Sequence, residues 1–140
     1  MTTTVISSGV TSSGIVLNFG DTELISSGGI AIGTVANGGQ EYVFFGGVAS
    51  GTTVNDGGIE VVSSGGVAIS TTVNSGGAEF VSSGGVASGS VVSSGGSVEL
   101  PVTSALGIWS AGGTHVIDGV TIEPGANVSL DVYAGGSTTP

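Results

Sequence analysis

Three glutamates recur at a constant spacing and form the most regular set of chemically active side chains in the sequence. Glu41, Glu60 and Glu79 follow one another with a period of 19. If each period formed one turn of a stacked structure, these carboxylates would lie about 5 Å apart and repel one another. Such a column could bind cations, because carboxylate oxygens suit Ca²⁺. We expect instead a solvated outer carboxylate ladder and no metal site, because the sequence has no aspartate-rich glycine nonapeptide and Glu99 falls one position out of the column.

A second group of candidates for chemistry lies near the end of the sequence. His115, the single histidine, has Asp118 and Ser110 close to it, which raises the possibility of a catalytic triad. A triad needs a positioned nucleophile, a base and a group that orients the base. No Gly-x-Ser-x-Gly motif, the usual mark of a nucleophile on a sharp turn, occurs near these residues. We therefore predict that His115 is a surface or turn residue and that no residue of the chain is catalytic.

Carboxylate pairs could in principle cleave polysaccharides, as they do in glycoside hydrolases. Asp118 with Glu123, and Asp21 with Glu23, are the pairs that come closest to this pattern. Such enzymes usually surround the pair with basic or aromatic side chains. The chain has no Lys or Arg and only one Trp, two Tyr and four Phe. A carbohydrate-active enzyme stays an alternative, but we expect no enzyme and no cofactor.

The charge of the chain excludes two classes of partner. With 10 acidic residues and no Lys or Arg, the formal net charge is −10. Nucleic-acid phosphates need basic side chains, so nucleic acid is not an expected partner. Anionic membrane surfaces repel such a chain, and no segment approaches transmembrane length, so we expect no insertion into a membrane. The first residues show no signal peptide, from which we expect a piece of a longer exported protein or another export route.

Paired glycines divide the sequence into repeats and predict its architecture. One series of pairs begins at residues 38, 57, 76 and 95, and a second begins at residues 46, 65 and 84, both with a period of 19. A period of this size indicates a solenoid. Short stretches of Val and Ile separated by Gly, Ser and Asn predict short strands and tight corners. The aligned valines that predict an interior are Val43, Val62 and Val81, then Val48, Val67 and Val86, and then Val54, Val73 and Val92.

The repeat also predicts how the chain is organised. Residues 1–96 are expected to form a repeat β-solenoid, best ordered in residues 38–96, and small slips in the spacing are expected in turns. The pattern fails after Gly96, so residues 97–140 are expected to form irregular coils or a cap of the same solenoid. The aromatic residues Tyr42, Phe44, Phe45 and Phe80 are expected to stack in the interior.

The segment from Gly65 to Gly85 resembles the AIDA-type repeat of bacterial autotransporter adhesins, which include self-associating proteins. The resemblance is carried by Gly65-Gly66-Val67-Ala68-Ile69-Ser70-Thr71-Thr72-Val73-Asn74-Ser75-Gly76-Gly77 and continues through Ala78-Glu79-Phe80-Val81-Ser82-Ser83-Gly84-Gly85. It is strong over residues 28–96. It implies an all-β fold, a single-stranded, right-handed parallel β-helix whose coils have a period of about 19, displayed outside the cell at the bacterial surface.

The resemblance also implies a modification of the repeats. Members of this family carry O-linked heptose on serines and threonines of the repeats. Carried over by position, the candidates for glycosylation here are Ser63, Ser64, Ser82, Ser83, Thr52, Thr53, Thr71 and Thr72.

The function expected from these observations is structural and adhesive. An extracellular β-solenoid would act by self-association, head-to-tail or lateral, or by adhesion to surfaces, as in biofilm formation or aggregation. Its partners would be further copies of itself, in a homo-oligomer or filament, and possible additional partners are host or bacterial surface glycans. The open sheet edges at the ends of such a rod favour pairing with other strands. Besides a carbohydrate-active enzyme, a passive spacer or fibre subunit stays an alternative.

Overall fold

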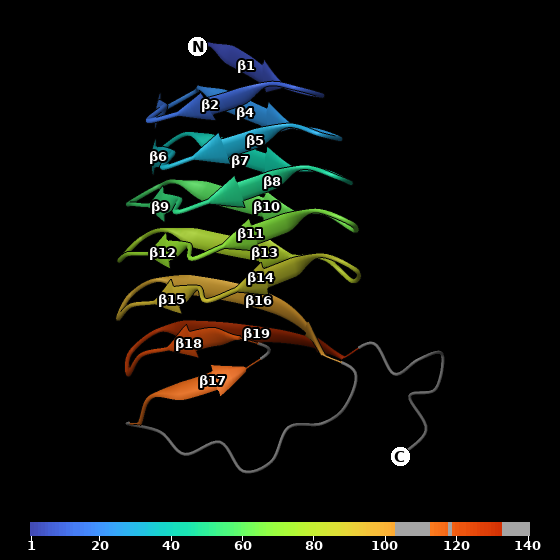
Figure 1. Cartoon of the computed structure of the whole chain (residues 1–140). Coiled ribbons are helices and arrows are strands. Elements are labelled where there is room, and N and C mark those ends of the chain that lie inside the picture. Colours follow the sequence, from blue (N-terminus) through green and yellow to red (C-terminus); the bar gives the residue numbers. More distant parts are fainter. Residues whose placement is uncertain (103–112, 118, 133–140) are drawn as a thin grey trace.

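The chain folds into a stack of coils made of β-strands wound about one axis (Figure 1). The computed structural model describes residues 1–102, 113–117 and 119–132. Three sheets, here named A, B and C, run along the stack as its faces, and nearly all of their strand pairs are parallel. Among the described residues, no helix has the length and hydrophobicity needed to cross a lipid bilayer.

Each of the first five coils contributes one strand to each sheet in turn. Sheet A contains β1 (Thr3–Ile6), β4 (Thr22–Ile25), β7 (Gln40–Val43), β10 (Ile59–Val62), β13 (Ala78–Val81), β16 (Ser97–Val102) and β19 (Asn127–Val132). Sheet B contains β2 (Thr11–Ser13), β5 (Ile30–Ile32), β8 (Val48–Ser50), β11 (Val67–Ile69) and β14 (Val86–Ser88). Sheet C contains β3 (Val16–Asn18), β6 (Val35–Asn37), β9 (Thr53–Val54), β12 (Thr72–Val73), β15 (Val91–Val92), β18 (Val120–Ile122) and β17 (His115–Ile117). The expected all-β solenoid, with one coil for each period of the sequence, is confirmed.

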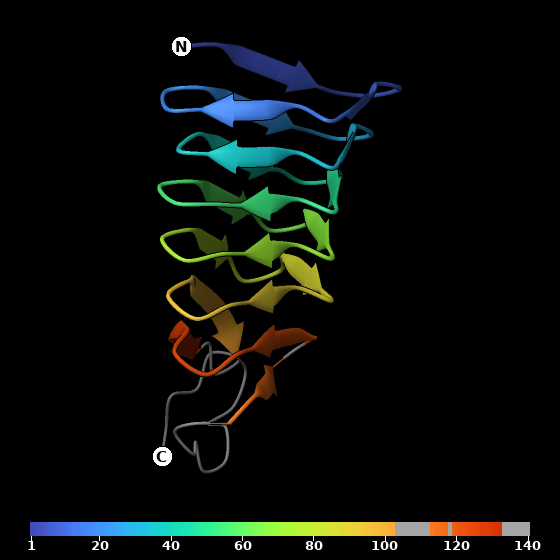
Figure 2. The same ribbon diagram turned by 90° about the vertical axis from the view of Figure 1, so that its left-hand side faces the viewer.

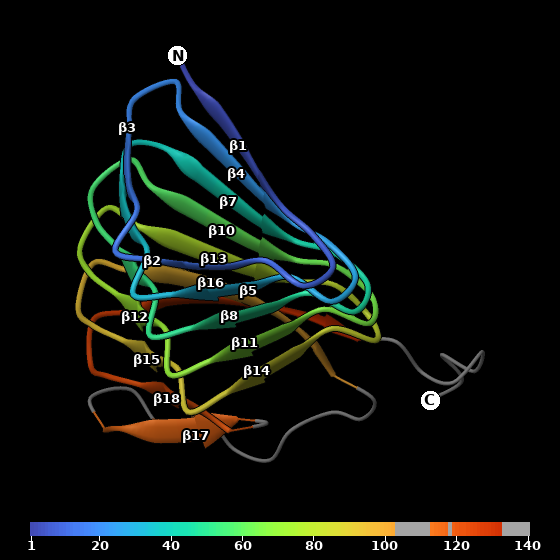
Figure 3. The ribbon, with the colours of Figure 1, turned by 45° about the horizontal axis from the view of Figure 1, so that its top comes forward.

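The coils wind in a right-handed sense. Figure 3 looks obliquely onto the N-terminal end, where the chain follows β1, then β2, then β3, and returns to β4 one level further from the viewer. This path is clockwise and recedes from the viewer, which defines a right-handed helix. In Figure 2 the successive coils lie one below the other without crossing.

The pairing of strands follows the period of the sequence, with two exceptions. Thr3 pairs with Thr22, and Ile59 pairs with Ala78, which is the regular step of one period. Thr22 pairs with Gln40, one position short of that step, because the corner after β6 passes from Asn37 directly to two glycines. The expectation that such slips fall in turns is therefore confirmed. Ser97 pairs with Asn127, so the sixth coil is longer than the regular ones by more than half a period.

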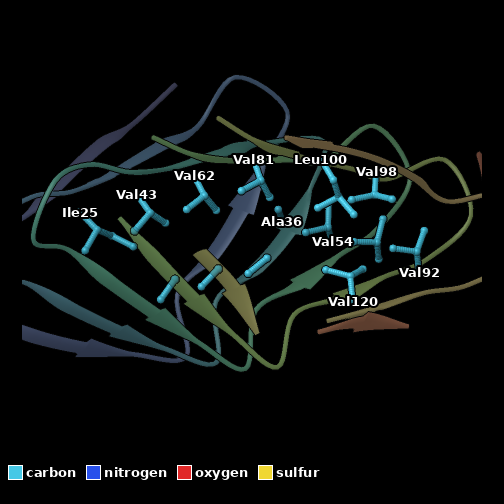
Figure 4. Packing of buried hydrophobic residues seen from close by; sticks show 14 of the residues in the cluster. Ile25, Ala36, Val43, Val54, Val62, Val81, Val92, Val98, Leu100 and Val120 are labelled. Carbon is cyan, nitrogen blue, oxygen red and sulfur yellow. The ribbon is translucent and has the colours of Figure 1, made fainter. Parts of the chain in front are cut away.

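The interior is a set of columns in which identical or similar side chains stack along the axis. In sheet A the column contains Ile25, Val43, Val62 and Val81 and is continued by Leu100 (Figure 4). Val54, Val73 and Val92 form the corresponding column in sheet C. The interior positions predicted for the valines of these two columns are confirmed. In sheet B the interior positions are the alanines, Ala49, Ala68 and Ala87, so the prediction that Val48, Val67 and Val86 lie inside is wrong. Side chains alternate between faces along a strand, so a valine and its neighbouring alanine cannot both be interior.

The glycine pairs that begin at residues 46, 65 and 84 form the corner between sheets A and B, and those that begin at residues 38, 57 and 76 form the corner between sheets C and A. Each member of a pair is needed for a different reason. Gly65 has a φ of 80° in a turn closed by a hydrogen bond of 2.8 Å from the Gly66 N–H to the Ser63 carbonyl. A residue with a side chain is strained at that φ. Gly66 is buried, and a Cβ atom there would lie 2.5 Å from the carbonyl oxygen of Val43 in the preceding coil. The first glycine thus allows the turn and the second allows the coils to approach.

Beyond β15 the solenoid continues with altered geometry. β16 and β19 extend sheet A, and β18 extends sheet C next to β15. β17 runs antiparallel to β18, with Val116 opposite Thr121, so the regular parallel order of sheet C ends there. Ser110 and Asp118, two members of the triad considered from the sequence, lie outside the described residues, and of His115 the structure describes only the backbone.

Candidate functional sites: an interior carboxyl ladder and the outer faces

The glutamate column lies inside the rod, so the expectation of an outer ladder is wrong. Glu41, Glu60 and Glu79 occupy β7, β10 and β13 in register, and each is 0% exposed. Glu23 on β4 pairs with Glu41 and adds a fourth member, equally buried. The physical reason is the alternation of side chains along a strand, because each glutamate precedes an interior Val or Ile by two positions and must share its face.

Hydroxyl groups from the corner after sheet B approach the ladder from inside the rod. The Thr34 hydroxyl donates to Glu23 Oε2 at 2.8 Å, and the Ser12 hydroxyl on β2 donates to Glu23 Oε1 at 3.2 Å. The Ser90 hydroxyl donates to Glu79 Oε1 at 3.1 Å. Thr34 and Ser90 each follow their glutamate by 11 residues. Every coil that carries a glutamate therefore also carries a hydroxyl at this position.

The two central carboxyl groups are less well satisfied than the outer two. Thr52 and Thr71 follow Glu41 and Glu60 by the same interval, but their hydroxyls form no hydrogen bond of good geometry within the described residues. Both carboxyl oxygens of Glu41 and of Glu60 are also without a donor there, as is Oε2 of Glu79. Buried polar atoms are normally paired, so this cluster is an exception that needs an explanation.

The environment of Glu41, Glu60 and Glu79 favours the neutral form of their carboxyl groups. Burial raises the pKa of Glu41 from 4.5 to about 7, with a further contribution from the charge of Glu23. Burial likewise raises the pKa of Glu79 from 4.5 to about 7. For Glu60, burial and then the charges of Glu41 and Glu79 raise the pKa well above its ordinary value. These directions follow from the cost of holding a charge away from water beside a like charge.

The ladder has defined ends. In the same column, Thr4 precedes Glu23 on β1 and Val98 follows Glu79 on β16. The carboxyl groups are thus confined to four successive coils. No group of three histidine or acidic side chains among the described residues is arranged to hold a metal ion.

The carboxylate pair Asp21 and Glu23 does not form a hydrolytic site. Glu23 points into the interior, whereas Asp21 lies in the corner before β4. Asp21 accepts hydrogen bonds from the Asn18 N–H at 3.0 Å and from the Thr2 N–H at 2.8 Å. The bond from Asn18 is the main reason that the pKa of Asp21 is lowered, with smaller contributions from Thr2 and the N-terminal ammonium group. Of the other pair, Asp118 lies outside the described residues.

The candidates for glycosylation separate into three groups by exposure. Ser64, Ser82 and Ser83 are exposed at the corner between sheets A and B. Ser63, Thr53 and Thr72 are half-buried. Thr52 and Thr71 are only 1% exposed and face the carboxyl ladder, so the expectation that they could carry glycans is wrong for the folded rod. Their threonine neighbours are the next residues in the sequence and therefore point outward.

The aromatic side chains lie on the outside, and the expectation of interior stacking is wrong. Phe45 is 74% exposed at a corner, and Phe44 and Phe80 are also exposed, while Tyr42 is half-buried. The Tyr42 and Phe44 rings stack on the outer surface with centroids 6.1 Å apart. On the outer face of sheet A one column is apolar over five coils, in the order Val5, Leu24, Tyr42, Val61 and Phe80.

The fold defines the class of protein: a parallel β-solenoid whose interior is closed by stacked side chains and whose outer faces repeat from coil to coil. Residues 39–96 match the family model AIDA, described as "adhesin of bacterial autotransporter system, probable stalk". The crystal structure of a TibC-catalysed, hyper-glycosylated fragment of TibA is similar to this chain, with 43% identity and a TM-score of 0.69. The match covers 71% of this chain and 36% of the TibA chain. No curated protein matches the chain.

The chain is therefore similar to the AIDA-type passengers of bacterial autotransporter adhesins, and residues 39–96 carry the repeat of their stalk. This family is displayed at the cell surface, so the expected extracellular location is confirmed. The chain spans about a third of the TibA fragment that it matches. The matching family model and the similar TibA fragment support the coarse function of an adhesive stalk.

Proposed function

We propose that this chain forms part of an adhesive stalk that self-associates with further copies of itself, laterally or head-to-tail, in cell aggregation or biofilm formation. The observation that carries the proposal is the regularity of the outer faces, because any contact made by one coil is available again on the next. Weak contacts repeated along a rod add up to a stable interface without any single strong site.

The outer face of sheet A supports lateral association. Its apolar column from Val5 to Phe80 runs parallel to the rod axis and includes Leu24, Tyr42 and Val61. Contiguous exposed apolar surface on soluble proteins frequently marks an interface. A second copy offers the same column at the same spacing, so two rods laid side by side could bring their columns together along their length.

The test is sedimentation velocity of the purified chain over a concentration series, with two variants. Lateral association predicts that the double variant Tyr42→Ser, Phe80→Ser shifts assembly to higher concentration by an order of magnitude or more. The control is Phe45→Ser, which removes an aromatic ring of similar size from a corner outside the column. If both variants assemble like the parent chain, the contact is at the ends of the rod. A monomer at every concentration contradicts self-association and favours the passive spacer.

We further propose that the exposed serines of the corners are sites of O-glycosylation. The similar TibA fragment is described as hyper-glycosylated through TibC. Ser64, Ser82 and Ser83 are exposed here, and Ser63, Thr53 and Thr72 are partly accessible. Mass spectrometry of the chain coexpressed with TibC tests the proposal, with glycans expected on the exposed serines and none on Thr52 or Thr71. Glycans confined to other residues would contradict it. Binding to host or bacterial surface glycans is a separate proposal, which a glycan array tests.

Residues 1–96 are proposed as the repeat solenoid and the segment from Ser97 onward as its cap. β17 pairs antiparallel with β18 and covers the edge of sheet C, where a further parallel strand would otherwise add. Covered edges oppose edge-to-edge association. If the segment is instead an assembly contact, replacing β17 residue Val116 by Lys should reduce head-to-tail assembly relative to the parent chain, whereas a cap predicts that the replacement leaves assembly unchanged or increases it.

A further inference from the structure

The four carboxyl groups inside the rod have too few donors if all are ionised. An ionised carboxylate only accepts hydrogen bonds, whereas a protonated one also donates. The hydroxyls of Thr34, Ser12 and Ser90 supply donors to Glu23 and Glu79. The oxygens of Glu41 and Glu60 receive none of good geometry from the described residues. A proton carried by one carboxyl group of a neighbouring pair would supply the missing donor.

Neighbouring carboxyl groups in the column are close enough to share such a proton. Glu23 pairs with Glu41, Glu41 with Glu60 and Glu60 with Glu79 on neighbouring strands, which lie about 4.8 Å apart. Contacts between two acceptors are repulsive, but they become hydrogen bonds as soon as one member is protonated. The hydroxyls of Thr52 and Thr71 lie beside the two central glutamates. Each can donate only one hydrogen bond, so even with these donors one oxygen of Glu41 and one of Glu60 would have none.

No lysine or arginine can neutralise the ladder, because the sequence has none, and the single histidine, His115, is on β17, beyond the four coils that carry the glutamates. The described interior side chains of sheet B that face the ladder are Ser12, Ala31, Ala49, Ala68 and Ala87. Those of sheet C are Leu17, Ala36, Val54, Val73 and Val92, so the described part of neither sheet adds a titratable group. The N-terminal ammonium group contacts Asp21 outside the ladder.

We propose that Glu41, Glu60 and Glu79, with Glu23 as a neighbouring hydrogen-bond acceptor, form a proton-binding ladder. Protons shared between neighbouring carboxyl groups hold successive coils together, so that the rod is more stable in acidic than in alkaline medium. The proton is the ligand that fits, because a hydrogen bond can bridge carboxyl groups at paired positions of strands about 4.8 Å apart. Among the described residues, no group of three acidic or histidine side chains could hold a metal ion.

The direction of the pH dependence follows from the protonation of the folded and unfolded chains. In the unfolded chain these glutamates lose their protons near the ordinary pKa of 4.5, whereas in the rod Glu41 and Glu79 keep theirs to a pKa of about 7. Between these values the folded chain binds more protons than the unfolded chain, so stability falls as the pH rises. For Glu41 and Glu79 the contribution is complete below pH 4.5 and lost above about pH 7, and the raised pKa of Glu60 acts in the same direction.

The test is the thermal unfolding midpoint of the whole chain between pH 4.5 and alkaline pH, with Glu60→Gln as the variant. The parent chain is expected to lose on the order of 10 °C over this range. Glutamine is neutral, similar in size and both donates and accepts, so the variant should lose clearly less. The control is Glu123→Gln at an exposed corner, which should keep the slope of the parent. A midpoint that is flat or rises with pH in the parent chain overturns the proposal.

A second measurement does not depend on how the variant folds. Infrared difference spectra of the parent chain at about pH 6, where ordinary glutamates are ionised, should contain the absorption of protonated carboxyl groups. That absorption should disappear on unfolding at the same pH. Its absence in the folded chain overturns the proposal. If the rod at this pH instead unfolds on addition of a chelator and is restored by Ca²⁺, the ladder is a cation site and the proposal is also overturned.

Discussion

At the scale of single residues, the repeat is controlled by backbone positions at which a side chain has no room. Gly66 shows this most clearly, because a Cβ atom there would lie 2.5 Å from the Val43 carbonyl oxygen, a distance that real structures do not show. The same contact recurs at Gly47 against Ile25 and at Gly85 against Val62. The second glycine of each pair is therefore required by the approach of two coils and not by the turn itself.

Replacing Gly66 with Ala is expected to destabilise the rod by about 1–3 kcal/mol or more, because a buried backbone contact must open to admit the methyl group. Chemical denaturation of the variant measures this loss. Ser64→Ala, at an exposed position of the same turn, is the control and should change stability by less than about 0.5 kcal/mol. Equal stability of the two variants would contradict the packing described for this corner.

Ser70 is the one residue other than glycine with a positive φ, 57°, among the described residues. The corresponding corners of other coils have Gly33, Gly51 and Gly89, with φ between 68° and 72°. Ser70→Gly is expected to stabilise the rod by about 0.5–1 kcal/mol, because the strain of the left-handed conformation exceeds the entropy cost of glycine. Thermal unfolding measures the gain.

The matched control for this corner is Gly51→Ala, which introduces the same strain in the preceding coil. A Cβ atom at Gly51 meets only the Gly33 nitrogen, at 3.9 Å, so strain and not crowding should decide the result. It should cost about 1–2 kcal/mol. A neutral result at both corners would show that the left-handed conformation is not retained in solution.

The interior residues can be predicted from the sequence wherever it is clear which alternate residues of a strand face inward. The aligned columns place Val43 and Val62 inside, and the same alternation, applied two positions earlier, also places Glu41 and Glu60 inside. The prediction of an outer ladder fails because it gives the charge of the glutamates more weight than this alternation. A constant period cannot align Glu23 with them, because the short corner at Asn37 shortens one step. The prediction for the aromatic residues fails in the same way, since Phe80 adjoins Glu79 and must face outward.

At the scale of elements, the corner between sheets C and A is held by side-chain amides that bond from coil to coil. The Asn55 amide donates to Asn37 Oδ1 at 2.7 Å, and the Asn74 amide donates to Asn55 Oδ1 at 2.8 Å. Asn55 is thus the middle member, with a neighbour on each side. These stacked amides add side-chain hydrogen bonds between successive coils at a corner, just beyond the ends of β9 and β12.

Removing the middle amide is expected to break both links at once. Asn55→Ala should lower the free energy of unfolding by about 1–2 kcal/mol, because each hydrogen bond contributes about 1 kcal/mol. Asp56→Ala, on the exposed neighbour, is the control. Hydrogen exchange should show faster opening near Asn37 and Asn74 in the Asn55 variant alone. Unchanged exchange at both neighbours would contradict a connected amide ladder.

The elements beyond the regular repeat are less accessible to prediction. The loss of periodicity after Gly96 predicts irregular coils, and β16, β18 and β19 do extend the sheets. The antiparallel pairing of β17 with β18 has no signal in the repeat, because it depends on a chain reversal in a segment that the period does not cover. A single period can predict a strand only where the chain continues to follow it.

At the scale of the whole molecule, stability and function are properties of stacked coils and not of one site. Each coil contacts only the coils next to it, as in other solenoids, so a coil can be added or removed without changing the rest. The outer column of sheet A, the exposed serines and the interior carboxyl ladder all follow this repeat. An adhesive stalk needs length and repeated surface, and both come from the same repeating unit.

The most direct test of a rod built from interchangeable coils is deletion of one whole coil, residues 57–75, compared with deletion of residues 57–66. Removing the whole coil joins Asp56 to Gly76 and leaves every column in register, so we predict a shorter rod that still folds, unfolds cooperatively and self-associates. Removing residues 57–66 takes out strand β10 of sheet A together with the glycine pairs of the corners on either side of it. The chain would then pass from sheet C directly to sheet B, which should abolish folding. Circular dichroism with thermal unfolding decides between them. If the whole-coil deletion fails to fold, or both deletions fold equally well, the rod is not built from interchangeable coils.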